Sequence, residues 1–300
     1  MAEPTDAALL QLLELRSKLL GAIRRFFQER GFVEVETPAL VPSPGLDVHL
    51  SAFEVRDPAG GTVGWLATSP EYQMKRLLSA GATRIFQLCR SYRSEEQGRH
   101  HEREFAMLEW YRANAGSDEV IRDTEELIAF VAAALDRPAP ELEPPWERLS
   151  VETALRLHAD RSLASVARDD VQFFRVWAEV QPRLGTERPV VVTDWPASMA
   201  SLARLKRNGM ADRFEAFFRG VELCNGFGEL TDAVEQRRRF EQDQAERKAA
   251  GLPVYPLDER FLADLERGMP ESGGNALGVD RWLMLLVGAE SLQAVMPFPA

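Results

Sequence analysis

The sequence predicts an α+β fold in which an antiparallel β-sheet is flanked by helices. Residues 84–113 contain two apolar, strand-like runs separated by a polar loop, which indicates a hairpin with a long loop. Residues 213–230 contain two further apolar runs that meet at Arg219-Gly220, a pair suited to a two-residue turn. Residues 8–30 have apolar side chains at helical spacing before Gly31, and residues 117–135 also predict a helix.

Composition and charge restrict the class of protein. With 300 residues, 45% hydrophobic and 28% charged, the chain could hold one large or two ordinary domains. We expect a single domain over residues 1–300. No apolar run approaches the ~18 residues of a membrane span, and the acidic N-terminus is unlike a secretory signal. The net charge of −11 argues against broad nucleic-acid binding. Cys89 and Cys224 fit buried free thiols in a reducing cytoplasm, and no Cys/His spacing suggests zinc.

The hairpin at 84–113 carries the most informative pattern. Alternate strand residues share a face, so the second strand should present Phe105, Met107, Glu109 and Tyr111 on one face and Ala106, Leu108 and Trp110 on the other. A carboxylate held among large apolar neighbours is costly to bury unless a cation meets it. We expect the first strand to end on Arg93, whose guanidinium suits phosphate oxygens. The pattern predicts a site for a polyphosphate and a cation; the alternative is a surface hairpin with a solvated, salt-bridged loop.

The second hairpin places two carboxylates on one face. Pairing outward from the turn sets Phe218 against Val221, Phe217 against Glu222, and Glu215 against Cys224. Glu215 and Glu222 then become diagonal neighbours, ~7–8 Å apart at Cα. Two carboxylates at that separation can share Mg²⁺ and leave positions open for phosphate oxygens. A half-exposed hairpin whose glutamates face water is the alternative.

The remaining segments are predicted from local signals. Thr68 or Ser69 could cap a helix over 73–78, with Pro70 in its first turn. The other expected elements are a strand at 32–36, a loop at 136–149, helical structure over 151–180, a buried strand at 189–194, a solvated charged helix at 232–250, a helix at 258–267 and a helix at 279–287. Gly273, Gly274 and Gly278 are expected to let the backbone approach a ligand.

Several of these segments together resemble one enzyme family. RIFQLCRSYRSEEQGRHHEREFAMLEWYRA (84–113) resembles motif 2 of class II aminoacyl-tRNA synthetases, GNALGVDRWLML resembles motif 3 (about 273–287), and the helix, strand and proline at about 12–38 resemble motif 1. TSPEYQMKRL is similar to the lysyl subgroup and to its short paralogues, which join (R)-β-lysine to a lysine of elongation factor P. Residues 117–180 resemble the insertion between motifs 2 and 3. We expect no anticodon-binding barrel upstream, and therefore no stable tRNA binding.

The resemblance implies ATP and Mg²⁺ as cofactors, an aminoacyl adenylate as intermediate, and a homodimer formed through motif 1. Arg93 and Arg281 would be catalytic, on the α- and γ-phosphates, with Mg²⁺ on Glu215 and Glu222. Phe105 would stack on adenine. The implied ATP-binding residues are Arg93, Ser94, Glu95, His101, Glu102, Phe105, Glu222, Leu223, Gly278 and Arg281. The implied substrate-binding residues are Ser69, Pro70, Glu71, Glu109, Tyr111, Asn225, Phe227, Glu229 and Ala276, with Glu229 on the distal ammonium.

Two positions and three functions remain to be weighed. Ala276 stands where lysyl-tRNA synthetases typically have glycine, which favours (R)-β-lysine over α-lysine. Glu102-Arg103 replaces the usual Asn-Pro and puts an extra anion near phosphate. The favoured function is a ligase acting on elongation factor P, the second a truncated lysyl-tRNA synthetase-like enzyme with a tRNA or other amine acceptor, and the third a non-catalytic regulatory module.

Overall fold

The computed structural model describes residues 6–167 and 169–299 and contains two β-sheets. The strands of the large sheet are β1 (Val33–Glu34), β5 (Arg84–Tyr92), β6 (Glu104–Ala113), β7 (Glu147–Ser150), β8 (Val190–Trp195), β9 (Ala211–Phe218), β10 (Val221–Gly228) and β11 (Ser272–Gly278). The small sheet consists of β2 (Leu40–Val41), β3 (Glu54–Arg56) and β4 (Thr62–Leu66).

The large sheet runs in the order β1-β5-β6-β11-β10-β9-β8-β7. All neighbouring strands are antiparallel except the edge pairs β1–β5 and β7–β8, which are parallel. β11, close to the C-terminus, lies between the two hairpins and joins β6 to β10. The expected α+β class with a mainly antiparallel sheet is therefore confirmed.

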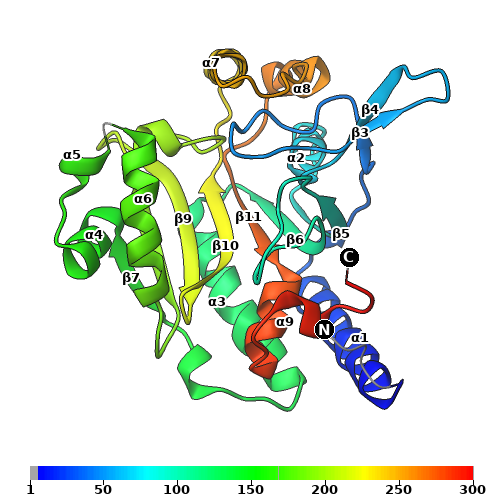
Figure 1. The fold of residues 1–300 in the computed structure, drawn as a ribbon, viewed down its shortest axis with the longest axis vertical. Helices are drawn as coiled ribbons and strands as arrows, with labels where there is room; N and C mark the ends of the chain where they lie inside the picture. The colour runs from blue at the N-terminus through cyan, green and yellow to red at the C-terminus, as the bar shows by residue number, and fades with distance from the viewer. Residues whose placement is uncertain (1–5, 168, 300) are drawn as a thin grey trace.

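Helices cover the sheet in three groups (Figure 1). They are α1 (Asp6–Glu29), α2 (Glu71–Ser79), α3 (Ser117–Ala134), α4 (Val151–Ala159), α5 (Leu163–Val166), α6 (Asp170–Val180), α7 (Ala233–Ala249), α8 (Glu259–Arg267) and α9 (Val279–Val287). The first hydrophobic cluster joins α1, α3 and α9 to one sheet face, the second joins α4 and α6 to β8 and β9, and the third joins α2, α7 and α8. Within the described residues, no helix is both long and apolar enough to cross a membrane.

Tertiary contacts change several elements that local signals predict. The proline-rich loop at 136–149 ends in β7, which forms because Glu147–Ser150 finds a parallel partner in β8. The helical stretch at 151–180 divides into α4, α5 and α6. The strand expected at 32–36 is assigned only over Val33–Glu34, although the Val35 N–H still donates to the Phe86 carbonyl at 2.9 Å. Residues 232–250 are expected to form a solvated charged helix, but α7 also buries one of its charged side chains, Arg247, completely.

Both hairpins have the expected form, with one correction to their register. Ala106, Leu108 and Trp110 of β6 lie in the hydrophobic core, as their alternation predicts. Arg219 and Gly220 form the turn with φ of 51° and 74°, and Phe218 pairs with Val221. Glu215, however, lies opposite Asn225 rather than Cys224, because a bulge between Glu222 and Cys224 inserts one residue into β10.

A buried ion pair connects the N-terminal helix to the C-terminal one. Arg16 of α1 donates to Asp280 Oδ1 at 2.7 Å and to the Val295 carbonyl at 2.8 Å. The second oxygen of Asp280 accepts the Ala106 backbone N–H of β6 at 2.7 Å. Because both Asp280 oxygens are engaged, this residue fixes α1, β6 and α9 relative to one another.

Removing this carboxylate should destabilise the fold. We expect Asp280→Ala to lower the free energy of unfolding by about 3–5 kcal/mol, because it leaves the Arg16 guanidinium buried without its anion. Urea denaturation would measure the loss. Arg24→Ala is the matched control, since Arg24 pairs with Glu34 at the surface and should cost about 1 kcal/mol or less. Equal losses in the two variants would contradict the structural role of Asp280.

Candidate active site

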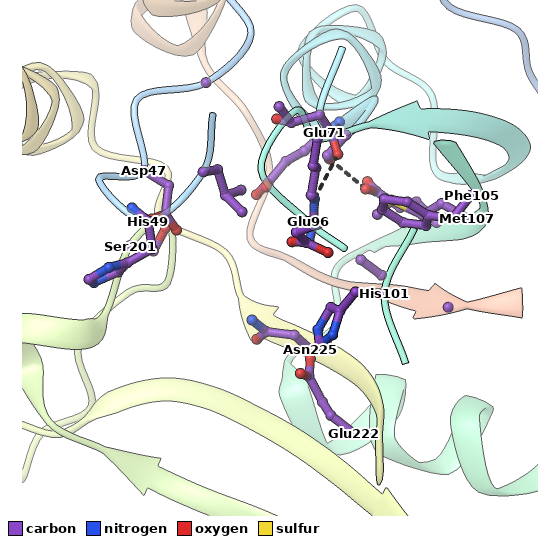
Figure 2. Close-up of a pocket in the computed structure, with 18 of the residues that line it drawn as sticks. Asp47, His49, Glu71, Glu96, His101, Phe105, Met107, Ser201, Glu222 and Asn225 are labelled. Atoms are coloured by element: carbon purple, nitrogen blue, oxygen red, sulfur yellow. Dashed lines mark hydrogen bonds and ion pairs between the residues drawn. The ribbon is translucent and has the colours of Figure 1, made fainter. Parts of the chain in front are cut away.

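A cavity of about 530 Å³ lies on the face of the sheet that is not covered by α1 and α3. Its floor comes from β6, β9, β10 and β11, and its walls come from the residues before α2, the loop between β5 and β6, and the start of α9. Figure 2 shows the side chains of Glu71, Glu96, His101 and Glu222 gathered around this space, with Phe105 and Met107 at one side. The cavity is therefore assembled from the two hairpins, the start of α2 and the motif 3 segment, whereas the motif 1 segment does not line it.

Most of the expected site residues meet here. Those that line the cavity are Ser69, Glu71, Arg93, His101, Glu102, Phe105, Glu109, Glu215, Glu222, Leu223, Asn225, Phe227, Ala276, Gly278 and Arg281. Pro70, Ser94, Glu95, Tyr111 and Glu229 do not line it. Tyr111 and Glu229 lie directly behind the lining, whereas Glu95 is exposed and Glu96 takes the position in the wall.

One end of the cavity holds a buried lysine between two carboxylates. The Lys75 ammonium is 2.6 Å from Glu71 Oε1 and 2.5 Å from Glu229 Oε2, and its side chain is fully buried. Lys75 and Glu71 lie one turn apart on α2. Glu229 Oε1 has no hydrogen-bond partner among the described residues, so this buried oxygen keeps unused acceptor capacity.

Glu109 adds a third carboxylate to this end. Ser69 donates to its Oε1 at 2.5 Å and Tyr111 donates to its Oε2 at 2.9 Å. Ser69 also accepts the Glu71 backbone N–H at 3.0 Å, and Thr68 donates to the Pro44 carbonyl. The cap expected at Thr68 or Ser69 is wrong, because the N-cap of α2 is Pro70 and no side-chain hydrogen bond caps the helix. Burial, followed by the nearby charge of Glu71, raises the pKa of Glu109 to about 8.

The charges at this end do not balance. Glu71, Glu109 and Glu229 are three carboxylates, and Lys75 is the single ammonium among them, which leaves two negative charges in excess when all are ionised. Burial raises the pKa of Glu229 to about 8 as well, even though Lys75 opposes that shift. A buried site of this kind gains energy from any ligand that brings positive charge, because the ligand replaces lost solvation. We define Glu71, Lys75, Glu109 and Glu229 as the acidic end of the cavity.

Two arginines face the opposite part of the cavity. Arg281, in the first turn of α9, donates through Nε to the His100 carbonyl at 3.0 Å and lies 3.5 Å from Glu222 Oε2. Arg93 donates to Glu96 Oε1 at 2.8 Å, and its guanidinium lies 5.1 Å from the centre of the Phe105 ring. Both arginines are partly buried and remain accessible to an anion in the cavity.

The loop between β5 and β6 brings polar groups near these arginines. Burial, followed by the charge of Arg281, lowers the pKa of His101, so its imidazole is neutral at pH 7. Glu102, the anion that departs from the family pattern, is buried and accepts a hydrogen bond from the Gln293 side chain. The structure thus provides a partner for this unusual carboxyl within the cavity wall.

The paired glutamates of β9 and β10 occupy the cavity floor. Glu215 is buried and forms an ion pair with Arg213 at 2.5 Å, while Glu222 is nearer the surface. Burial raises the pKa of Glu215 to about 7, with Arg213 opposing the shift and Glu222 adding to it. Among the described residues, no group of three or more His, Cys, Asp or Glu side chains could hold a metal ion alone. Any divalent cation here would need further oxygen ligands from a substrate.

Three residues of the site escape reasoning from sequence. In the sequence, Lys75 has the pattern of a solvent-facing helix residue, although its spacing of four residues from Glu71 indicates an ion pair. Arg213 is two residues from Glu215, hence on the same face of β9. Glu96 lines the cavity and Glu95 does not, because of the conformation of the loop. A loop has no periodic pattern from which this could be predicted.

Two motif 3 glycines serve packing between protein groups rather than the approach of a ligand. A Cβ on Gly274 would lie 2.3 Å from the Tyr111 ring and 2.4 Å from Glu229 Oε1. A Cβ on Gly273 would lie 2.5 Å from the Gly116 carbonyl oxygen. Gly274 therefore gives the acidic end the room it needs, and of the three glycines only Gly278 lines the cavity.

The raised pKa of Glu109 predicts a specific pH dependence. A carboxyl whose pKa rises on folding stabilises the protein below its unfolded pKa, and this contribution is lost as pH rises toward about 8. In the absence of the amino-acid substrate, the free energy of unfolding of Glu109→Gln, measured by urea denaturation, should equal that of the wild type at pH 5 and exceed it at pH 9. Glu104→Gln, at the exposed start of β6, should match at both values. Parallel pH profiles for wild type and Glu109→Gln would contradict the assignment.

Comparison with known proteins agrees with this geometry. The family model for tRNA synthetases class II (D, K and N) matches residues 4–300. A protein of Edwardsiella ictaluri named elongation factor P--(R)-beta-lysine ligase is 46% identical, with 94% of this chain and 93% of that protein covered. A protein of the same name from Pectobacterium carotovorum is 43% identical, with 99% of this chain and 98% of that protein covered. Another from Erwinia tasmaniensis is also 43% identical, with 98% of this chain and 96% of that protein covered. The match along the whole chain, on a fold that brings the motif 2 and motif 3 segments around one cavity, shows that this protein belongs to the class II tRNA synthetase family.

Proposed function

We propose that this protein is an ATP-dependent ligase that activates (R)-β-lysine, or lysine, as an adenylate and transfers it to the ε-amino group of a lysine of elongation factor P. The relatives that match nearly the whole chain carry the name of this activity. The observation that carries the proposal is the acidic end, where full ionisation of three carboxyl groups would leave two negative charges beyond the single ammonium of Lys75. A lysine-type substrate brings two ammonium groups and would neutralise them.

The substrate would lie on the floor between β10 and β6. Glu71 and Glu109 would bind one ammonium and Glu229 the other, sharing these carboxylates with Lys75. Asn225 supports this placement, because its Oδ1 has no described partner and its residue lines the cavity. Ser69, Tyr111 and Phe227 would complete the pocket around the alkyl chain.

The nucleotide would occupy the part of the cavity with the two arginines. Arg93 would leave Glu96 to bind the α-phosphate, and Arg281 would bind the γ-phosphate. Phe105 would stack on adenine, and the loop carrying His101 and Glu102 would close over the nucleotide. Preorganised guanidinium groups stabilise the negative charge that develops on a phosphoryl group.

Glu215 and Glu222 fit the donor set that Mg²⁺ prefers. Both residues line the cavity, and burial, the main cause of the raised pKa of Glu215, removes solvation that a bound cation would replace. We propose these two residues as metal ligands. A bound Mg²⁺ would neutralise charge on the β- and γ-phosphates.

The chemistry requires no nucleophilic side chain. The substrate carboxylate attacks the α-phosphorus of ATP, the bond to the β-phosphate oxygen breaks, and pyrophosphate leaves with the electron pair. The acceptor amine then forms a C–N bond to the activated carbonyl as AMP departs. The chain contributes by positioning the reactants and by electrostatics.

Further parts of the proposal concern assembly and location. We propose a homodimer formed through α1, whose Leu10 and Leu13 are exposed. Stable tRNA binding is not expected from a chain with a net charge of −11. A cytoplasmic location fits the two free cysteines, of which Cys224 is buried and Cys89 only partly so.

The first experiment is the intact mass of elongation factor P after incubation with enzyme, ATP-Mg²⁺ and (R)-β-lysine. We expect a gain of one β-lysyl residue. Arg281→Ala should lower the rates of this mass gain and of amino-acid-dependent pyrophosphate exchange by about 10²-fold or more, because γ-phosphate binding is lost. Arg122→Ala, a surface arginine on α3, is the control. No mass gain with exchange still running would instead favour a tRNA or another amine acceptor, and exchange that survives in Arg281→Ala would refute the role of Arg281.

Ala276 should influence the choice of amino acid. It lies between Asn225 of β10 and Glu109 of β6, so its methyl group projects beside the expected substrate position. Ala276→Gly should reverse or blunt the preference for (R)-β-lysine over α-lysine by about tenfold, the scale of one methyl group in a pocket wall. The ratio of kcat/KM in pyrophosphate exchange measures this change. An unchanged ratio would remove Ala276 from substrate selection.

A further inference from the structure

One wall of the cavity has no role in the proposed activation chemistry. It is formed by Asp47, His49, Phe174, Trp177, Gln181 and Ser201, which we call the α6 wall. Figure 2 shows Asp47, His49 and Ser201 grouped on one side of the cavity, with Phe105 and Met107 on the other. The wall joins the loop before β3 to α6, in the insertion to which the sequence assigns no chemistry.

The loop that carries Asp47 and His49 is held in place from behind. Buried Arg247 of α7 donates to the carbonyls of Asp47 at 2.7 Å and Leu50 at 2.9 Å. Asp47 Oδ1 in turn accepts the His49 backbone N–H at 2.8 Å. Because a buried guanidinium donates to two carbonyls of this loop, the loop is held in one conformation.

An aromatic contact links this loop to α6. The rings of His49 and Phe174 meet edge to face with centroids 5.1 Å apart. Phe173 and Trp177 stack behind them and pack on Trp195, so α6 is well anchored. Phe174 nevertheless remains 39% exposed, at the cavity rather than in the core. An exposed aromatic side chain at a pocket wall is typical of a ligand contact.

Carboxyl groups and guanidinium groups lie together beside this wall. Asp47 lies near Asp243 of α7, whose pKa rises to about 7 through burial and then through the charges of Asp47 and Glu246, with Arg239 and Arg247 opposing the shift. Arg247 donates to backbone carbonyls, so the Asp47 carboxylate is not used up in an ion pair with it. A carboxylate next to aromatic faces suits an alkyl chain that ends in an ammonium group.

We propose that the α6 wall receives the lysine side chain of the protein acceptor, with Phe174 along its methylenes and Asp47 and His49 at its nitrogen. This inference rests on the proposed function and adds to it the route by which the acceptor enters. The acceptor ammonium loses a proton, and its nitrogen forms the C–N bond to the adenylate carbonyl. The C–O bond to AMP breaks, AMP leaves with the electron pair, and the nitrogen releases a second proton.

The test separates activation from transfer. His49→Ala and Phe174→Ala should leave (R)-β-lysine-dependent pyrophosphate exchange within about twofold of the wild type, yet lower transfer from preformed adenylate to elongation factor P about tenfold or more, because a misplaced acceptor reacts slowly. His158→Ala on α4 and Val171→Ala on the exposed side of α6 are the matched controls. Equal loss of exchange and transfer, or unchanged transfer, would overturn the proposal.

A small acceptor keeps this test independent of the protein partner. Aminolysis of the adenylate by Nα-acetyl-lysine amide is measured in parallel for each variant. If wild-type enzyme modifies this amine but not elongation factor P, the proposed partner is wrong, and lower aminolysis in His49→Ala and Phe174→Ala still supports the α6 wall. Wild-type rates in both variants would refute the α6 wall even when the partner is correct.

Discussion

The burial of three carboxyl groups around one ammonium at the acidic end is the constraint on which the site depends. Three carboxylates can remain together in a buried place only because Lys75 lies among them and because Glu109 and Glu229 hold protons more tightly than usual. Such an arrangement costs stability in the free protein, and a ligand with two ammonium groups offsets that cost. Selection of a diamino acid therefore follows from charge balance as much as from the shape of the pocket.

The rest of the fold brings distant segments to this point. β11 lies between the two hairpins, so β6 and β10 contribute to one continuous floor. Asp280 then ties α1 and α9 to β6, which places Arg281, its neighbour in sequence, at the edge of the same cavity. Glu71, Glu109 and Glu229 gather at the acidic end, whereas Arg93 and Arg281 lie in the part of the cavity that would bind phosphates.

The cavity also extends beyond the space that activation would use. The loop held by Arg247 and the aromatic residues of α6 form a wall of different chemistry, with both apolar surface and a carboxylate. A two-step ligase must admit a second substrate while the first remains enclosed. If the acceptor binds at the α6 wall, activation and transfer can act on the same substrate carbonyl while using different binding residues.

The sequence alone determined the two hairpins and the faces of their strands, because strand alternation and short turns are local properties. The resemblance to class II synthetases predicted that Arg93, Glu109, Glu215, Glu222 and Arg281 belong to one site, and all five line the cavity. Only the tertiary structure decided that Lys75 is buried against Glu229, that Glu215 faces Asn225 across a bulge, and that β7 and α6 join the sheet and the cavity. These features depend on partners more than 40 residues away in the chain or on a one-residue slip in pairing. Periodicity within a segment contains no information about either.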